Sequence, residues 1–289
     1  MGGSRRTKEG KGVVESGSEK IVVVANPWDA LGYQAIEEAV AVFNKGGYAA
    51  AAALLDGAVK NADEPSVKRE LATLKTVMDG YAAWDRFNHK TAKGKFDDAL
   101  KNQNDLTSVF KHHVEEWICQ VKNHRTHVAT LADQTATRAW VQDLLHNARR
   151  RAEEDRYDDA VARLYRACEA LAQVQLRERH GIQDTERIPL DKLPTEFQQE
   201  WEPRARDGVV AIGLRDAYRL LKVLGDETGE KFFDEGLGGD TSPLSSRNQS
   251  ILAHGFTPVT KKVYDDLASV ICRLGKFEPE SQPWSLPVI

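Results

Sequence analysis

Apolar residues recur at helical spacing along almost the whole chain, and this repetition constrains the fold more than any other feature. Between residues 30 and 45 they fall three or four positions apart, which gathers them on one face of a helix. The same spacing returns in residues 48–60, 65–84, 96–106, 109–131, 140–154, 157–180, 214–224 and 260–274. The sequence therefore predicts an all-α fold.

The remaining segments carry other signals. Residues 20–25 form a short β-branched run, which is expected to be either the last strand of a domain outside this chain or a strand that pairs across a dimer. Residues 1–19 are rich in Gly, Ser and charge and are predicted to be disordered. Residues 181–203 read as a loop with one short helix at 195–201, and the glycine-rich residues 229–244 as a mobile loop.

Three predicted corners between helices share one local pattern. Each has a turn, then an aromatic residue, two short residues and an alanine, beginning at Gly46, Gly94 and Asp155. This pattern is typical of TPR-like helical hairpins, in which the alanine permits close approach of the helices. The spacing between the three corners is irregular, so it indicates reuse of a hairpin and not a regular solenoid. A protein-binding array remains an alternative.

Composition excludes several classes of protein. With 289 residues and 41% hydrophobic content the chain can form a large core, and a formal net charge of −4 argues against nonspecific nucleic-acid binding by the whole surface. No apolar run is long enough to span a membrane, and no signal peptide is present. The distant cysteines Cys119, Cys168 and Cys272 indicate a reducing, cytoplasmic setting with each thiol in the core.

Histidines at 113, 124 and 127 lie on one predicted helix and invite a metal interpretation. His124 and His127 are three residues apart and can share a face, but no His-Glu-x-x-His pattern surrounds them. We therefore predict no metal site. A local basic run, Arg149, Arg150 and Arg151, can contact RNA phosphates or can pair with the acidic residues at 153–155; the second interpretation is favoured.

Arg247 and His254 are the most informative polar pair. Ser242 followed by proline starts a short predicted helix, and Gly255 ends it. Seven positions on a helix place Arg247 and His254 within about 20° of each other, with Asn248 beside them. An arginine near a helix N-terminus is not the charge that the helix dipole favours. Spacing alone leaves two possibilities: a surface arginine with a helix-capping histidine, or a functional pair.

The run Arg247-Asn248, then five intervening residues and His254, matches the Arg-x(4–6)-His motif of HEPN ribonucleases. The surrounding residues 247–256, together with 145–152 and 157–167, resemble the CRISPR-associated CARF–HEPN ribonucleases, and the resemblance extends from about residue 26 to 274. It implies TPR-like helical hairpins at 20–134, a HEPN helical bundle at 135–275 and a tail at 276–289.

Several properties are implied by this resemblance. His254 would act as the acid/base or 2′-OH-orienting group, Arg247 would stabilise the phosphorane, and Asn248 would orient His254 or the phosphate. No cofactor is needed, and two chains would combine as a homodimer on an RNA substrate. Family members carry an N-terminal CARF sensor that binds cyclic oligoadenylate. The residues before Lys20 are too few to form one, so an upstream CARF domain or another CRISPR component is an expected partner.

Two other functions fit the same helices. A noncatalytic helical interaction module is one, and the toxin of a toxin–antitoxin pair, with the same chemistry under different control, is the other. The intact motif at Arg247, Asn248 and His254 favours a nuclease over a scaffold.

Overall fold

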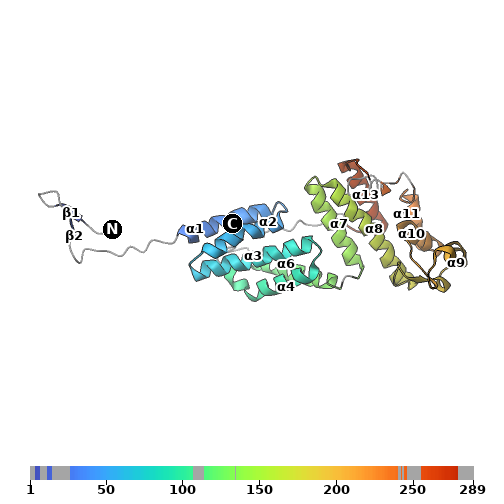
Figure 1. Cartoon of the computed structure of the whole chain (residues 1–289), viewed down its shortest axis with the longest axis horizontal. Helices are drawn as coiled ribbons and strands as arrows, with labels where there is room; N and C mark the ends of the chain where they lie inside the picture. The colour runs from blue at the N-terminus through green and yellow to red at the C-terminus, as the bar shows by residue number, and fades with distance from the viewer. Residues whose placement is uncertain are drawn as a thin grey trace.

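The protein is a chain of packed helices with almost no sheet, so the predicted all-α fold is confirmed. The computed structural model describes residues 4–6, 12–14, 27–106, 114–133, 135–239, 242, 244–245 and 255–278. Figure 1 shows two groups of helices side by side, with α1 to α6 in one and α7 to α13 in the other.

The first group is a series of antiparallel hairpins in which each helix packs on its neighbours in sequence. Its members are α1 (Pro27–Phe43), α2 (Tyr48–Asn61), α3 (Pro65–Asp85), α4 (His89–Lys101), the 3₁₀ turn η1 (Gln103–Leu106) and α6 (Val114–Leu131). The ring of Tyr81 lies at the centre of this core. It makes edge-to-face contacts with Phe43 and Phe96 at centroid distances of 5.2 and 4.9 Å.

Local chemistry explains most of these helix ends. Gly46 has a φ of 87°, which a glycine adopts without strain, and it separates α1 from α2. Pro65 occupies the first turn of α3, where its missing N–H costs nothing, and Glu64 caps this end by accepting from the Ser66 amide at 3.4 Å. Asn88 caps α4 in the same way by accepting from the Thr91 amide.

The predicted turn at Gly94 is wrong. Gly94 lies inside α4 at an exposed position, and the turn between α3 and α4 lies at Arg86–Asn88 instead. Phe87 makes this turn with a φ of 59°. The glycine that packing requires is Gly80, where a Cβ would lie 2.7 Å from the Phe96 ring.

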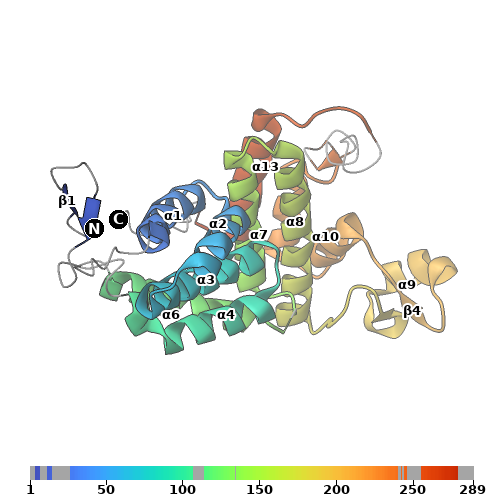
Figure 2. The same ribbon diagram turned by 60° about the vertical axis from the view of Figure 1, so that its left-hand side comes forward.

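The second group is built around a long helical pair. This pair is α7 (Arg138–Glu153) and α8 (Tyr157–His180), with α10 (Leu214–Val223) and α13 (Lys261–Gly275) packed against it and α11 (Glu227–Asp234) packed on α10 and α13. Between α8 and α10 the chain makes β3 (Ile188–Pro189), η3 (Leu190–Lys192), α9 (Thr195–Trp201), η4 (Glu202–Arg204) and β4 (Val209–Val210). Figure 2 shows α9 and β4 projecting away from the α7–α8 pair.

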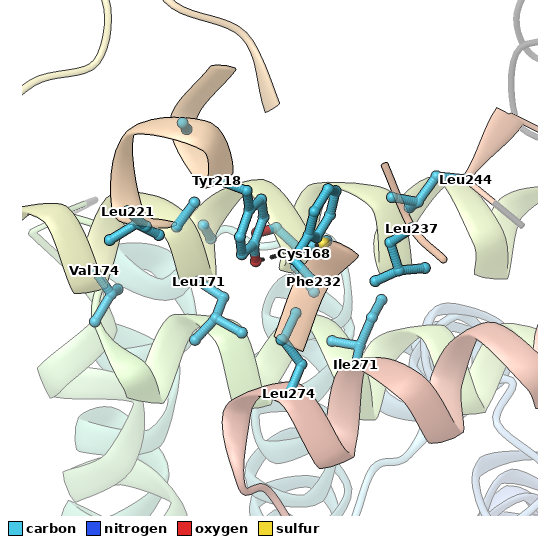
Figure 3. Close-up of a cluster of buried hydrophobic side chains, with 14 of the residues drawn as sticks. Cys168, Leu171, Val174, Tyr218, Leu221, Phe232, Leu237, Leu244, Ile271 and Leu274 are labelled. Carbon is cyan, nitrogen blue, oxygen red and sulfur yellow. Dashed lines mark hydrogen bonds between the residues drawn. The ribbon is translucent and has the colours of Figure 1, made fainter. Parts of the chain in front are cut away.

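A stacked aromatic pair lies at the centre of the second core. The rings of Tyr218, on α10, and Phe232, on α11, are 3.9 Å apart at their centroids and nearly parallel. The Tyr218 hydroxyl donates to the carbonyl of Cys168 on α8 at 2.9 Å, so its one polar atom is satisfied in the core. Leu171 and Ile271 close the cluster from α8 and α13 (Figure 3).

Residues 229–244 differ from the predicted mobile loop. Their first part belongs to α11, and Gly229 lies so close to α10 that a Cβ would be 2.3 Å from the backbone nitrogen of Lys222. Leu237 and Leu244 are buried in the second core (Figure 3). Glycine in this stretch therefore permits close helix packing at one position, which composition alone cannot distinguish from loop flexibility.

The structure describes only two short strands of the N-terminal region before α1. Within 1–19, β1 (Ser4–Arg6) and β2 (Gly12–Val14) pair antiparallel, which differs from the disorder expected there. The predicted strand at 20–25 lies outside the described residues. Within the ranges given above, no helix combines the length and apolar character needed to cross a bilayer.

The cysteines occupy three different environments. Cys168 is buried, as predicted, and Cys272 is half-buried. Cys119 is exposed, which corrects the expectation of a core position: it lies two residues after the buried Trp117 and so faces outward on α6.

Candidate active site

The three predicted catalytic residues, Arg247, Asn248 and His254, lie outside the described residues. The structure does describe both flanks of the segment that holds them. This segment, residues 246–254, is called the motif segment below.

The flank before the motif segment is tied to the second core. Leu244 is 4% exposed and packs beside Leu237 (Figure 3). The amide of Ser245 donates to the carbonyl of Ser242 at 2.9 Å, and Ser245 is already helical. The predicted helix itself, from Ser242 to Gly255, lies mostly outside the described residues.

The flank after the motif segment leads directly into α13. Residues 255–260 have no helical assignment, in accord with a helix that has ended by Gly255. Val259 is buried, and the Thr260 side chain caps α13 by accepting from the Val263 amide at 3.4 Å. Within this second flank Phe256 is 92% exposed. The motif segment is thus joined at both ends to buried residues of one helical bundle.

A cavity of about 630 Å³ lies between α7, the start of α8 and α13. The α7 and α13 walls each carry charged groups of both signs. Its lining residues with ionisable or hydroxyl groups are His146, Arg149, Glu153, Asp155, Tyr157, Lys261, Tyr264, Asp265, Ser269, Cys272 and Glu278. Because α13 follows the motif segment in the chain, this cavity is the described feature most directly connected with it.

Burial keeps several groups of this cavity neutral. It lowers the pKa of His146 to about 4, with smaller opposing and reinforcing contributions from nearby charges. It raises the pKa of Tyr264 to about 12, and it raises the pKa of the Cys272 thiol. An imidazole with so low a pKa is a poor general acid near neutral pH. His146 is therefore unsuited to protonate a leaving group.

Two protein-family models match the chain, one for each group of helices. Residues 31–131 match the Csm6 6H domain, and residues 129–278 match the Csm6 HEPN domain. The chain belongs to the Csm6 HEPN family. This confirms the resemblance to CRISPR-associated HEPN ribonucleases and assigns a CRISPR-associated HEPN nuclease family to the chain. Comparison with curated proteins found no match.

The two matched domains coincide with the two helix groups. The first group lies in the 6H domain, and the second lies in the HEPN domain together with the motif segment. The matches meet at residues 129–131, close to the predicted boundary between residues 134 and 135.

Each histidine that the structure describes is either buried or in contact with a nearby side chain. His89 contacts Asp143, and His180 lies 3.2 Å from Asp226. The His124 ring bonds through Nδ1 to the Tyr81 hydroxyl at 2.8 Å. His127 packs on the Trp84 ring, and burial lowers its pKa. With His146, these account for all five of the described histidines, and His112, His113 and His254 lie outside the described ranges.

The arginine run has a location that its sequence did not reveal. Arg150 Nε donates to Asp85 Oδ1 at 3.0 Å, and Arg151 Nη2 donates to Asp85 Oδ2 at 2.6 Å, with all three side chains largely buried. These two arginines therefore join the HEPN domain to the 6H domain and are not surface groups for RNA. Arg149 pairs with Glu153 at 3.0 Å and lines the cavity beside α13. A contact between Arg149 and RNA stays a prediction.

Of the three histidines that invite a metal interpretation, His113 lies outside the described residues. In the part of the chain that the structure describes, no group of three His, Cys, Asp or Glu side chains is arranged to hold a metal ion.

Sequence reasoning missed two acidic residues, Asp85 and Asp143, that organise the junction between the domains. Each is a single carboxylate in a helix, and its partners lie more than fifty residues away in sequence. The local signal was the run of three adjacent arginines, because consecutive helix residues point in different directions and at least one had to face the packed side of the helix.

Proposed function

We propose that the chain is a metal-independent endoribonuclease of the HEPN type that acts in CRISPR-linked antiviral defence and cleaves single-stranded RNA. The observation that carries the proposal is the Csm6 HEPN match over residues 129–278, which includes the Arg247-Asn248 and His254 motif. The flanks of the motif segment support it, because Leu244 and Val259 are anchored in the same core.

The chemistry needs no metal because RNA carries its own nucleophile. The 2′-OH loses its proton, the 2′ oxygen attacks the adjacent phosphorus, and the bond from phosphorus to the 5′ oxygen breaks as that oxygen gains a proton. The products are a 2′,3′-cyclic phosphate and a 5′-hydroxyl. In this scheme His254 orients or deprotonates the 2′-OH or protonates the leaving oxygen, since an unperturbed imidazole titrates near pH 6.5.

Arg247 and Asn248 stabilise and orient the reacting groups. Arg247 offers a fixed, bidentate cation to the non-bridging oxygens as negative charge develops on the phosphorane. Asn248 orients His254 or the phosphate. Because the chain has a single motif, we place the working site at a two-fold junction where motif segments from two chains converge. In that arrangement specific activity falls when the protein is diluted below its dimerisation constant.

The test is an RNA cleavage assay in the presence of EDTA. Wild type, Arg247→Ala and His254→Ala are compared on one labelled single-stranded RNA, with circular dichroism to verify folding. We expect wild type to cleave and each variant to lose nearly all activity with its helical content unchanged. Cleavage at the wild-type rate by either folded variant, or no cleavage by wild type, contradicts the proposal.

A further inference from the structure

A second cavity, of about 460 Å³, lies at the junction of the 6H and HEPN domains and is distinct from the cavity beside α13. Its walls are Phe87 from the α3–α4 turn, Trp140 and Leu144 from α7, and Arg163 and Arg166 from α8, with alanines between them. Its volume is in the range of small-ligand sites. We call it the junction cavity.

Two aromatic rings form one side of the junction cavity. The rings of Phe87 and Trp140 lie 6.0 Å apart at their centroids and are inclined by only 14°. The His89 ring meets Trp140 edge-on at 4.5 Å and so holds the indole from behind. Both Phe87 and Trp140 are only half-buried. They therefore present flat apolar surface to the cavity.

The backbone at Phe87 is in a conformation that large side chains disfavour. Its φ of 59° lies in the left-handed region, where asparagine or glycine is the usual residue. Such outliers persist where the surrounding structure holds them, and they are concentrated at binding sites. Here the conformation brings the ring of Phe87 across the domain boundary onto Trp140 of the HEPN domain.

The ionisable side chains that line the junction cavity are cationic, although the chain as a whole is acidic. Arg163 and Arg166 line it, and among the described residues no carboxylate does. In the cavity beside α13, by contrast, Arg149 and Lys261 face several carboxylates. Arg163 is paired with the Asp159 carboxylate at 3.1 Å and also donates to the Asp159 carbonyl at 2.8 Å and to Asn147, so its charge is largely compensated.

Arg166 is the more available cation. Its side chain is 47% exposed, with Gln173 Oε1 at 3.1 Å and Glu169 Oε2 at a distant 4.0 Å. A guanidinium has five N–H donors, so these two neighbours leave donors for an anion.

We propose that the junction cavity binds one nucleotide of an RNA chain, with its base on the Phe87 and Trp140 rings and its phosphate on Arg166. Flat aromatic rings stack on any nucleobase, and arginine pairs with phosphate through two parallel hydrogen bonds. The inference rests on the proposed function, because it makes the cavity a holding site for substrate at a distance from the chemistry.

The test measures RNA binding without cleavage. A fluorescein-labelled, 2′-O-methylated oligonucleotide, which lacks the free 2′-OH, is titrated with the full chain and followed by fluorescence anisotropy. Arg166→Ala removes the cation, and Phe87→Asn removes the ring while keeping a residue that tolerates positive φ. We expect each variant to bind about tenfold more weakly, as loss of one stacked base or one phosphate contact implies.

Arg179→Ala is the matched control. Arg179 lies on the same helix, is 59% exposed and has one carboxylate, Asp226, at 3.6 Å. It is 13 residues, or about 20 Å, further along α8. We expect Arg179→Ala to bind RNA as wild type does. Equal losses in the Arg179 and Arg166 variants, or wild-type affinity in both Arg166→Ala and Phe87→Asn, would overturn the inference.

An abasic oligonucleotide distinguishes base stacking from phosphate binding, and mononucleotides distinguish an RNA site from a site for a free nucleotide. An abasic oligonucleotide with the same phosphates should bind wild type and Phe87→Asn equally, since it has no base to stack. AMP and UMP should compete with the labelled RNA only at far higher concentration than an unlabelled oligonucleotide. If either mononucleotide competes at micromolar concentration, the cavity is a site for a free nucleotide and the inference is wrong.

Cleavage kinetics separate this inference from the proposed function. Arg166→Ala should raise KM several-fold with kcat unchanged, whereas His254→Ala should lose kcat. If wild type does not cleave RNA, the proposed function fails, and the anisotropy titration still decides the junction cavity. If wild type cleaves and Arg166→Ala has wild-type KM, the inference about the cavity alone fails.

Discussion

The Nε2 atom of His89, in the 6H domain, lies 2.9 Å from Oδ2 of Asp143, in the HEPN domain, and these side chains are only 2% and 1% exposed. The other oxygen of Asp143 accepts from the Trp84 indole at 2.9 Å. One buried carboxylate therefore satisfies two donors from the neighbouring domain. This contact holds α7 against α3 and α4 at a fixed position, and α7 in turn lines both cavities.

Loss of the Asp143 carboxylate should destabilise the protein strongly. Asp143→Ala leaves the buried Trp84 and His89 nitrogens without that acceptor, which costs about 3 kcal/mol. Urea unfolding followed by tryptophan fluorescence measures it. Asp98→Ala, which removes an exposed ion pair with Lys101, is the control and should change stability little. Similar unfolding midpoints for the two variants would contradict this role of Asp143.

Asp85 should couple the unfolding of the two domains. It is the carboxylate shared by Arg150 and Arg151, so Asp85→Ala removes a counter-charge from two largely buried guanidinium groups, of which Arg151 keeps Glu154 at 3.2 Å. We expect a loss of about 3–5 kcal/mol and a heat-capacity trace that broadens or divides into two transitions, one for each core. Scanning calorimetry measures this, and a single sharp transition at the wild-type temperature would contradict the coupling role of Asp85.

Stability should fall as the pH drops below about 6.5. Burial lowers the pKa of His124 to about 4, and its neighbour His127 adds a smaller effect in the same direction. In the unfolded chain the pKa of histidine is about 6.5, so between these values the unfolded state binds more protons. The expected slope is at most about 1.4 kcal/mol per pH unit for this residue.

His124→Asn checks the pH effect directly. Asparagine offers an oxygen to the Tyr81 hydroxyl but does not titrate. Urea unfolding of this variant between pH 4.5 and 7.5 should show a shallower loss of stability toward low pH than wild type. An unchanged slope would show that His124 is not a source of the acid sensitivity.

A pair of glycine substitutions tests the packing of α11 on α10. In Gly229→Ala the new Cβ would lie 2.3 Å from the Lys222 backbone nitrogen, so α11 must move away from α10, and we expect a loss of about 2 kcal/mol or more. Gly57→Ala, at an exposed position of α2 with nothing within 4 Å, should stabilise by about 0.5–1 kcal/mol. Thermal melts measure both, and the same sign for the two variants would contradict this packing.

Helix positions were predictable wherever local signals set both ends. The segment 157–180 was predicted with the same bounds as α8, because a corner precedes Tyr157 and Gly181, with a φ of 70°, ends the helix. The turn at Phe87 was missed, because glycine is the usual sign of positive φ and here packing across the domain junction holds a phenylalanine in that conformation.

The junction between the domains was not predictable from one sequence. Asp85 and Arg151 are 66 residues apart, and no local pattern marks them as partners. For the same reason the pairing of Phe87 with Trp140 could not be foreseen. The candidate catalytic residues are instead close together in sequence. Arg247, Asn248 and His254 were identified from a short motif within one predicted helix, and their roles stay predictions.

The central claim is RNA cleavage by the 2′-OH without a metal ion, and the ends of the products test it most directly. Wild-type protein is incubated with a synthetic single-stranded RNA in excess EDTA, and the fragments are identified by mass spectrometry. We predict fragments that end in 2′,3′-cyclic phosphates, with new 5′-hydroxyls on their partners. Fragments with 3′-hydroxyls and 5′-phosphates, or activity that EDTA abolishes, would contradict the account.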